Sequence, residues 1–230
     1  MATKYELPEE ADVNLLSNLG KEVEMKTFKT NVLPTLECDK DQVLNIKILC
    51  LGDYTGRVGR KGVLIKDYLQ VTPPVPTHMR PLIGCDFYLK TIKWEKGGDH
   101  NPWPITIKLL LFEVAEQERF TRMTNLYYRD SHGALIFWGP GNSSSLDGAP
   151  KWLKDVNRAY PSISCVLVTD NTSKKPLYGP DEKFEREMAF DQFWKDHGFA
   201  DHFEIKARDW ESGENSVFGQ AVSTVLLRRF

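Results

Sequence analysis

The stretch from Asn45 to Gly52 reads NIKILCLG, and it sets the pattern for the rest of the chain. It is a short apolar run that ends at a glycine, which is typical of a buried strand. A glycine-rich loop follows, and Val63–Leu69 then has a helical pattern. The proline cluster at Thr72–Pro76 ends that helix. Strand, loop and helix in this order begin an α/β pattern.

Strand-like and helix-like segments alternate over the rest of the chain. The strand-like segments are apolar or alternating runs at Ile83–Trp94, Ile105–Phe112, Ala134–Trp138, Ile163–Val168 and Phe203–Ala207. The helix-like segments carry apolar residues at helical spacing and lie at Lys151–Tyr160, Lys183–His197 and Ser216–Arg229. Gly97 and Gly98 predict a hairpin turn between two of the strands. This order predicts a three-layer α/β sandwich with a mostly parallel six-stranded sheet, whose strand-end loops form the ligand site.

The composition limits the partners that the chain is expected to bind. Its 30 basic and 32 acidic residues give a formal charge of −2. A nucleic-acid binder would have an excess of basic residues, which this chain does not have. The four cysteines have no paired spacing, which indicates reduced thiols rather than a zinc or redox site. Residues 1–44 show no sustained period, so we expect an N-terminal extension there and one domain over 45–230.

The N-terminus and the apolar runs indicate where the protein resides. Met1–Leu16 carries acidic residues where a secretory signal needs an apolar stretch. No window of the sequence approaches the roughly 18 consecutive apolar residues of a membrane span. We therefore expect a cytoplasmic protein.

Five local motifs carry a family resemblance. They are KILCLGD at 47–53, IGCDFYL at 83–89, Ala115 followed by QERF at 117–120, MTNLYYRDSHG at 123–133, and FDQFWKDHGF at 190–199. In this order they resemble the Rab family of small GTPases, close to the branch that serves lysosome-related organelles. The resemblance spans roughly 45–230 and implies a P-loop G domain preceded by an N-terminal extension.

The phosphate-binding loop of the family reads G-x-x-x-x-G-K-[ST], in which glycine amides wrap the phosphates, the lysine neutralises them and the hydroxyl binds Mg²⁺. The matching stretch here runs from Gly52 to Lys61 and Gly62 and is about three residues longer than that pattern. Lys61 matches the phosphate lysine, whereas Arg60 replaces the glycine before it and Gly62 replaces the hydroxyl residue. The resemblance therefore implies a degenerate phosphate site.

The remaining nucleotide motifs also depart from the family. Leu82 stands where the family has a second Mg²⁺-binding threonine, so both direct protein ligands are missing. The W-D-x-A-G-Q-E motif becomes F-E-V-A-E-Q-E, in which Glu113 could hold water near a metal and Glu116 stands where a glycine of the family approaches the terminal phosphate. Gln117 matches the water-positioning glutamine, but hydrolysis also needs the metal and the phosphate cradle, so we expect no catalytic residue.

The two loops that read the guanine base are altered as well. The N-K-x-D motif aligns with Asp170 to Ser173, so a serine replaces the aspartate that binds guanine. Only Ala207 matches in the final S-A-K motif. We therefore expect neither nucleotide nor metal as a cofactor, and the alternative is that GTP or GDP with Mg²⁺ is retained through Lys61 and Glu113.

The partner-facing surface is kept better than the nucleotide site. Three aromatic residues on the switch side of Rab proteins contact effectors, and they correspond here to Phe87, Phe112 and Tyr127. The alternative is that these residues fill a core beneath the switch loops. No cysteine follows Cys165, so we expect no prenyl anchor.

These features together predict a Rab-like pseudo-GTPase. In this hypothesis the protein has lost hydrolysis and is a scaffold that binds proteins through its switch-side face and N-terminal extension, in a large cytoskeletal or ciliary assembly. The competing hypothesis is a divergent GTP-binding Rab protein that acts as a switch in vesicle trafficking. A different P-loop phosphoryl-transfer enzyme is a weaker third hypothesis, because no hydroxyl residue follows Lys61.

Overall fold

The computed structural model describes residues 28–30, 43–53, 60–70, 82–96, 105–120, 124–140, 143–171, 190–206 and 216–229. The described strands are β1 Phe28–Thr30, β2 Val43–Leu51, β3 Cys85–Lys96, β4 Ile105–Val114, β5 Gly133–Trp138, β6 Ser164–Asn171 and β7 Asp201–Lys206. The helices are α2 Arg60–Tyr68, the 3₁₀ helix η1 Glu116–Phe120, α3 Thr124–Tyr128, α4 Ser143–Ala159 and α6 Val217–Arg229. Residues 190–196 are also helical.

The strands form one sheet in the order β1-β3-β4-β2-β5-β6-β7. Within the described strands only β3 and β4 pair antiparallel, from Cys85 opposite Val114 to Trp94 opposite Ile105. β2 to β7 are the six strands that the sequence predicts, and the mostly parallel sheet is confirmed. The seventh strand, β1, lies within the expected N-terminal extension and pairs with the end of β3. β2 begins at Val43, two residues before the expected boundary of the domain.

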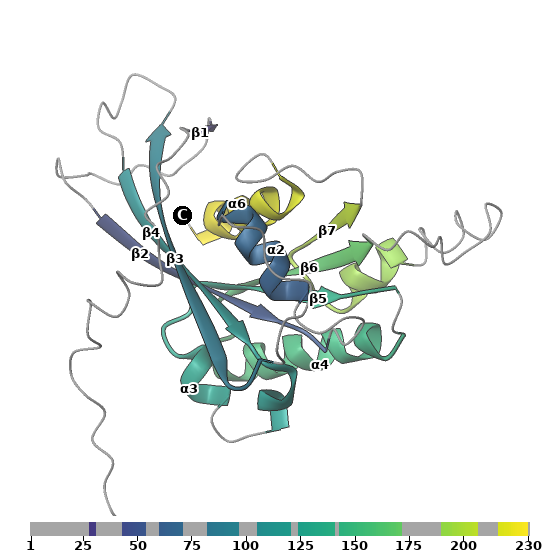
Figure 1. Ribbon diagram of the computed structural model, residues 1–230. Helices are drawn as coiled ribbons and strands as arrows, with labels where there is room; N and C mark the ends of the chain where they lie inside the picture. The colour runs from purple at the N-terminus through teal and green to yellow at the C-terminus, as the bar shows by residue number, and fades with distance from the viewer. Residues whose placement is uncertain are drawn as a thin grey trace, which may run out of the picture.

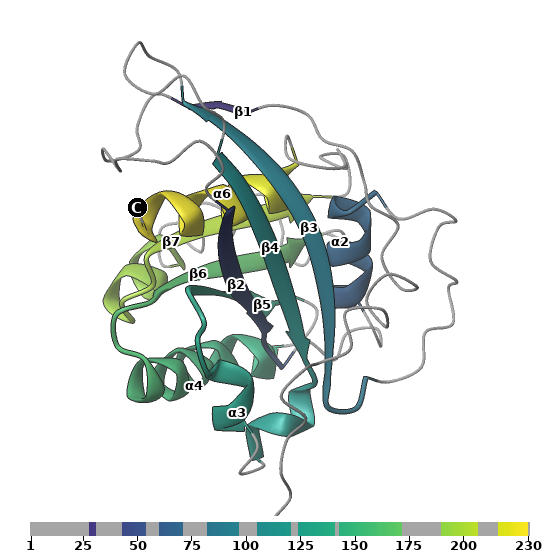
Figure 2. The same ribbon diagram turned by 90° about the vertical axis from the view of Figure 1, so that its left-hand side faces the viewer.

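Helices cover both faces of the sheet, as Figures 1 and 2 show. Successive residues of β2 point to opposite faces: Ile48 and Cys50 pack into the core beneath α2 and α6, and Leu49 and Leu51 pack into the core beneath α3 and α4. Because a strand segment buried on both faces must be apolar at every position, the unbroken apolar run Ile48–Leu51 at the end of β2 is explained. The parallel strands of the sheet place their carboxyl ends along one edge.

α4 differs from its sequence-based prediction in a way that the packing explains. α4 begins at Ser143, eight residues before the expected start at Lys151, and it contains Pro150 within its span. Its apolar face, with Ala149 and Trp152 fully buried, packs against the sheet and favours the longer helix despite the proline. Of the helix expected at Lys183–His197, residues 183–189 lie outside the described part of the chain.

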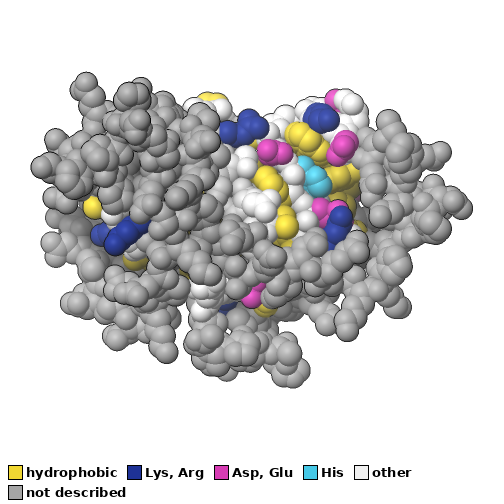
Figure 3. All heavy atoms as spheres, turned by 90° about the horizontal axis from the view of Figure 1, so that it is seen from above, with side chains coloured by type: hydrophobic (Ala, Val, Ile, Leu, Met, Phe, Trp, Pro, Cys, Tyr) yellow, Lys and Arg dark blue, Asp and Glu magenta, His cyan; other side chains and the backbone are white. Residues whose placement is uncertain are grey.

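α6 matches its prediction closely. The Ser216 Oγ accepts a hydrogen bond from the Gly219 amide at 3.0 Å, which caps the helix start. On the described part of the face shown in Figure 3, acidic and basic side chains are interspersed with apolar ones. This mixed pattern agrees with the near-neutral charge of the sequence.

Candidate functional site

Gly52 ends the first parallel strand at the edge where the expected ligand site lies. Its φ of +130° is a backbone conformation that favours glycine. A Cβ at this position would lie 2.1 Å from the Phe137 carbonyl oxygen, so the backbone of the neighbouring strand also excludes any side chain. The first glycine of the phosphate-loop pattern is therefore required by the packing of β2 against β5.

Lys61 lies in the first turn of α2, and its amine points back to the strand ends. The Nζ donates hydrogen bonds to the Val114 carbonyl at 2.8 Å and to the Gly52 carbonyl at 3.2 Å. The residue is 6% exposed, and burial lowers the pKa of Lys61, an effect that the nearby Glu113 and Glu116 oppose. The amine is thus held at the carboxyl ends of β2 and β4, where it can neutralise a bound anion.

Glu113 fills the space beside Gly62. A Cβ added to Gly62 would lie 2.7 Å from the Glu113 Oε2 and 3.2 Å from its Oε1. The Tyr88 hydroxyl donates a hydrogen bond to Oε2 at 3.0 Å. Burial raises the pKa of Glu113, and Lys61 and the bond from Tyr88 oppose that rise. The carboxylate therefore occupies the volume that a hydroxyl side chain at position 62 would need.

Lys61 does not form the ion pair that charge balance alone would favour. Among the described residues, no ion pair joins Lys61 to Glu113 or Glu116, because its Nζ is bound by two backbone carbonyls. The side chain of Arg60 lies outside the described residues. Glu116 opens η1, and burial raises the pKa of its carboxyl while Lys61 lowers it. Gln117, the next residue, is exposed.

Hydrogen bonds join the segment before β3 to η1. The Gly84 carbonyl accepts from the Ala115 amide at 2.9 Å, and the Gly84 amide donates to the Glu118 Oε1 at 3.2 Å. Leu82, which replaces the expected threonine, lies just before this contact. The segment that contains Leu82 and the segment that contains Glu116 and Gln117 are therefore bonded directly to each other.

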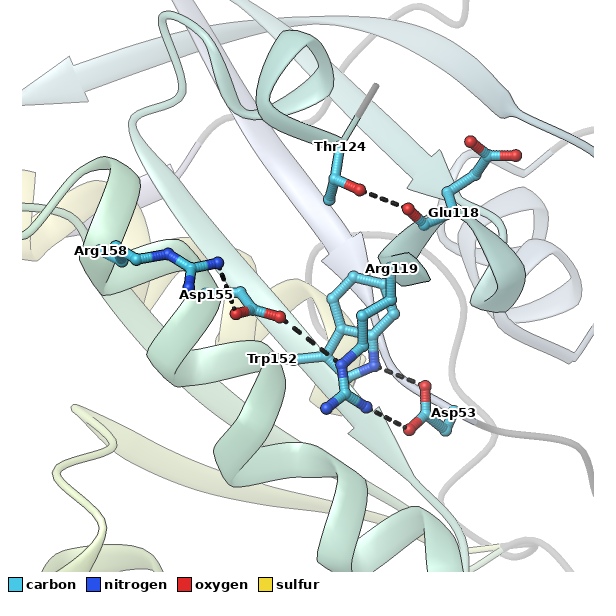
Figure 4. Close-up of polar contacts among 7 residues, drawn as sticks. All are labelled: Asp53, Glu118, Arg119, Thr124, Trp152, Asp155 and Arg158. Carbon is cyan, nitrogen blue, oxygen red and sulfur yellow. Dashed lines mark hydrogen bonds and ion pairs between the residues drawn. The ribbon is translucent and has the colours of Figure 1, made fainter. Parts of the chain in front are cut away.

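Figure 4 shows a second set of contacts, which we call the Arg119 cluster: Asp53, Arg119, Trp152, Asp155 and Arg158. The Asp53 carboxylate accepts from the Arg119 Nη1 at 2.9 Å and from the Trp152 Nε1 at 2.7 Å. Arg119 also lies 3.5 Å from Asp155, which pairs in turn with Arg158 at 3.0 Å. The cluster joins the start of the phosphate loop, η1 and α4.

Sequence reasoning did not find the Arg119 cluster. Asp53 and Arg119 both lie within family-like motifs, but no local spacing links them to each other or to Trp152. Gly148 gives the one indirect sign, because a Cβ there would lie 2.3 Å from the Asp53 Oδ2. A glycine inside an amphipathic helix can mark such a close approach.

The predicted guanine-binding residues are only partly described. Asp170 is 3% exposed near the end of β6, where it lies opposite Ile205 of β7. This places it at the same edge of the sheet as Gly52 and Glu113. Ser173 and Ala207 lie outside the described residues, so these two predictions remain without a structural account.

The three aromatic residues of the predicted partner surface lie on the α3 side of the sheet. Phe87 is 48% exposed, and its ring centroid lies 6.0 Å from that of Phe112. Phe112 and Tyr127 are partly buried against the core beneath α3 and α4. The other large apolar residues that are exposed in the described part of the chain are Val43, Ile83, Leu89, Phe120 and Leu126. Phe87 is therefore not a core residue. Phe112 and Tyr127 pack against the core and remain partly exposed at the surface.

Comparison with known proteins identifies the family. The sequence profile of the Ras family matches residues 47–226. The chain belongs to the Ras family of small GTPases. It is 31% identical over 168 residues to the Ras-related protein Rab-32 of Mus musculus, an alignment that covers 71% of this chain and 68% of the relative.

Two further relatives place the chain near the same Rab proteins. It is 29% identical over 174 residues to the Ras-related protein Rab-32A of Dictyostelium discoideum, with 71% of this chain and 70% of the relative covered. It is 27% identical over 168 residues to the Ras-related protein Rab-7L1 of Rattus norvegicus, with 71% and 74% covered. The resemblance to Rab proteins and the G-domain fold are confirmed.

Membership of the Ras family corrects the expectation that the protein has no cofactor. Ras and Rab proteins bind GTP or GDP with Mg²⁺, so the expected absence was wrong and the alternative is the one consistent with the family. The degenerate motifs led to the error, because each was judged by the residue type it had lost.

The described residues fit a nucleotide accompanied by Mg²⁺. Lys61 supplies a buried cation at the strand ends, and Glu113 supplies carboxylate oxygen, the ligand type that Mg²⁺ prefers. The described part of the chain holds no cluster of three or more His, Cys, Asp or Glu that could bind a metal alone. Phosphate oxygens would therefore complete the Mg²⁺ coordination, as is usual for this ion. Bound Mg²⁺ would neutralise phosphate charge.

One structural finding bears on the location of the protein. None of the helices in the described ranges is long and apolar enough to cross a membrane.

Proposed function

We propose that this Ras-family protein binds guanine nucleotide with Mg²⁺ in a remodelled pocket and contacts partner proteins in vesicle trafficking through its switch-side surface. The observation that supports this most is Lys61, a buried amine held by the Gly52 and Val114 carbonyls at the strand ends. Burying a lysine is costly unless its charge is used or paired. Both bonded carbonyls belong to the edge of the sheet where ligands bind in parallel α/β folds.

The same arrangement supports a proposal about hydrolysis. Efficient hydrolysis needs the metal, the phosphate cradle and the water-positioning glutamine together. Glu116 stands where the family has a glycine near the terminal phosphate, and Gln117 points into solvent at the start of η1. We propose that the protein hydrolyses GTP slowly or not at all, so that partners or nucleotide exchange determine its state.

A matched pair of lysine variants tests nucleotide binding. Lys61→Met removes the amine at the strand ends. Lys90→Met removes another buried amine, whose Nζ donates to the Tyr68 carbonyl at 3.3 Å far from that edge. We expect nucleotide extracted from the purified protein to be GDP or GTP, and GDP affinity to fall about tenfold or more in Lys61→Met alone, as for loss of one charged hydrogen bond.

Two results would contradict the proposal. One is a natively purified protein that contains no guanine nucleotide and gives no thermal shift with GDP. The other is an equal loss of GDP affinity in Lys61→Met and Lys90→Met. Single-turnover hydrolysis of GTP provides the separate test of catalysis, and we expect Gln117→Leu to leave the slow rate unchanged.

A second candidate function is supported by the Arg119 cluster. Contacts within the protein hold η1 against α4 and the start of the phosphate loop. In this alternative the protein is a scaffold whose partner binding is the same in the GDP and GTP states. Hydrogen exchange of the η1 amides distinguishes the two functions. Protection that differs between GDP and a non-hydrolysable GTP analogue favours a switch, and equal protection favours a scaffold.

A further inference from the structure

Gly62 and Glu113 form a size-matched pair at the edge of the sheet. The site carries the longer acidic residue, glutamate, beside the residue that has no side chain, glycine. The two positions touch: a Cβ at Gly62 would come within 2.7 Å of the Glu113 Oε2, closer than real Cβ atoms approach other groups. A side chain at position 62 and the carboxylate in its present position therefore exclude each other.

The carboxylate of Glu113 is buried and has capacity for a further ligand. Glu113 is 4% exposed. The Tyr88 hydroxyl donates a hydrogen bond to its Oε2 at 3.0 Å, and no other hydrogen bond to this carboxylate is found among the described residues. An ionised carboxylate has about four acceptor sites, so most of them remain unfilled in this buried position.

The position of this carboxylate indicates which ligand it takes. It lies next to the first turn of α2, in the space that a side chain at position 62 would occupy. Lys61, the neighbouring cation, is already bound by two backbone carbonyls. The oxygen closest to the position of the missing hydroxyl therefore comes from Glu113. Carboxylate oxygen is a stronger ligand for a hard divalent cation than a neutral hydroxyl.

We propose that Glu113 itself binds the divalent cation that accompanies the nucleotide phosphates, in place of the hydroxyl side chain that position 62 lacks. The inference rests on the proposed function, since the cation arrives with a nucleotide. Gly62 in place of a hydroxyl residue and Glu113 in place of an aspartate are then two coupled substitutions. The glycine leaves space beside α2, and the extra methylene of the glutamate places the carboxylate in that space. Tyr88 positions the carboxylate through its hydrogen bond to Oε2.

The release of bound GDP, measured with excess Mg²⁺ and again with EDTA, tests the role of Glu113. Glu113→Gln is the first variant, because the amide keeps the shape of the side chain and can still accept the bond from Tyr88. We expect Mg²⁺ to slow release from the parent protein and to have little effect on Glu113→Gln. Removing even an outer-shell partner of a metal commonly changes its affinity by about 10- to 100-fold, so we expect at least that range.

Gly62→Ser and the double variant Gly62→Ser/Glu113→Asp test the exchange itself. The serine Cβ displaces the longer carboxylate, so we expect Gly62→Ser alone to weaken the Mg²⁺ effect. Replacing Glu113 with the shorter aspartate in the same variant should restore the Mg²⁺ effect on GDP release. Thermal unfolding with GDP, in Mg²⁺ and in EDTA, gives a second readout of the same differences and shows whether each variant is folded.

The outcomes separate this inference from the proposed function. A parent protein that binds GDP, with a full Mg²⁺ effect preserved in Glu113→Gln, would overturn the inference and leave nucleotide binding intact. The inference would also be overturned if Mg²⁺ slowed GDP release from Gly62→Ser as much as from the parent protein. A parent protein that does not bind GDP with or without Mg²⁺ would overturn the proposed function, and the inference with it.

Discussion

Replacing Arg119 with alanine tests whether η1 is held by contacts within the protein. The substitution removes the guanidinium that lies 2.9 Å from Asp53 and 3.5 Å from Asp155 (Figure 4). It also removes a cation 5.6 Å from the centre of the Trp152 ring. We expect the variant to fold, because Trp152 still donates to Asp53 and Arg158 still pairs with Asp155.

The exposure of the side chains sets the size of the effect. The Arg119 and Asp53 side chains are 12% and 26% exposed, so their pair lies between the buried and the surface case. Losing one partner of a buried pair costs about 3–5 kcal/mol, whereas exposed pairs contribute roughly 0–1 kcal/mol. Since Asp53 keeps one strong donor, we expect a loss of about 2 kcal/mol in the free energy of unfolding. That loss lowers the melting temperature of a chain of this size by roughly 4–8 °C.

Urea unfolding measures the loss, and Arg129→Ala is the matched control. Arg129 also pairs with an aspartate, Asp130, at 3.4 Å, but the two side chains are 74% and 84% exposed. We expect Arg129→Ala to change stability by no more than about 0.5 kcal/mol. Equal effects of the two substitutions would refute the reasoning. So would a double-mutant cycle of Arg119→Ala with Asp53→Asn that gives a coupling below about 0.5 kcal/mol.

Two further predictions follow from the packing and the titration of single residues. Gly52→Ala should cost about 3 kcal/mol or more in urea unfolding, because its Cβ would meet the Phe137 carbonyl at 2.1 Å as well as adopt an unfavourable φ. Gly198→Ala, at φ +83° with open space around it, should cost only about 1–2 kcal/mol, and equal costs would contradict the steric argument. Burial lowers the pKa of His202 below its ordinary value of 6.5, although Glu204, Asp191 and Asp201 oppose the shift. The unfolded chain therefore takes up the proton at higher pH than the folded protein, so stability should fall as the pH drops from 6.5 through the lower folded-state pKa. His202→Gln should remove this fall and His197→Gln should keep it, which melting curves at several pH values would check.

The sequence by itself determined most of the elements and the mostly parallel character of the sheet. Strands buried on both faces must be apolar at successive positions, and amphipathic helices must repeat near every third or fourth residue, so both leave patterns within a short window. β2, β5 and α6 were predicted to within about two residues for this reason. The start of α4 was not, because Pro150 and Gly148 oppose a helix locally and only packing against the sheet overrides them.

The tertiary structure alone decided how the candidate site is assembled. Comparing each position with a motif showed that Gly62 lacks a hydroxyl and that Glu113 is longer by one methylene, but it could not show that one compensates for the other. The same holds for Asp53, Arg119 and Trp152, which belong to three different elements. Parallel strands bring residues distant in sequence to one edge of the sheet, and contacts formed there leave no periodic signal in the chain.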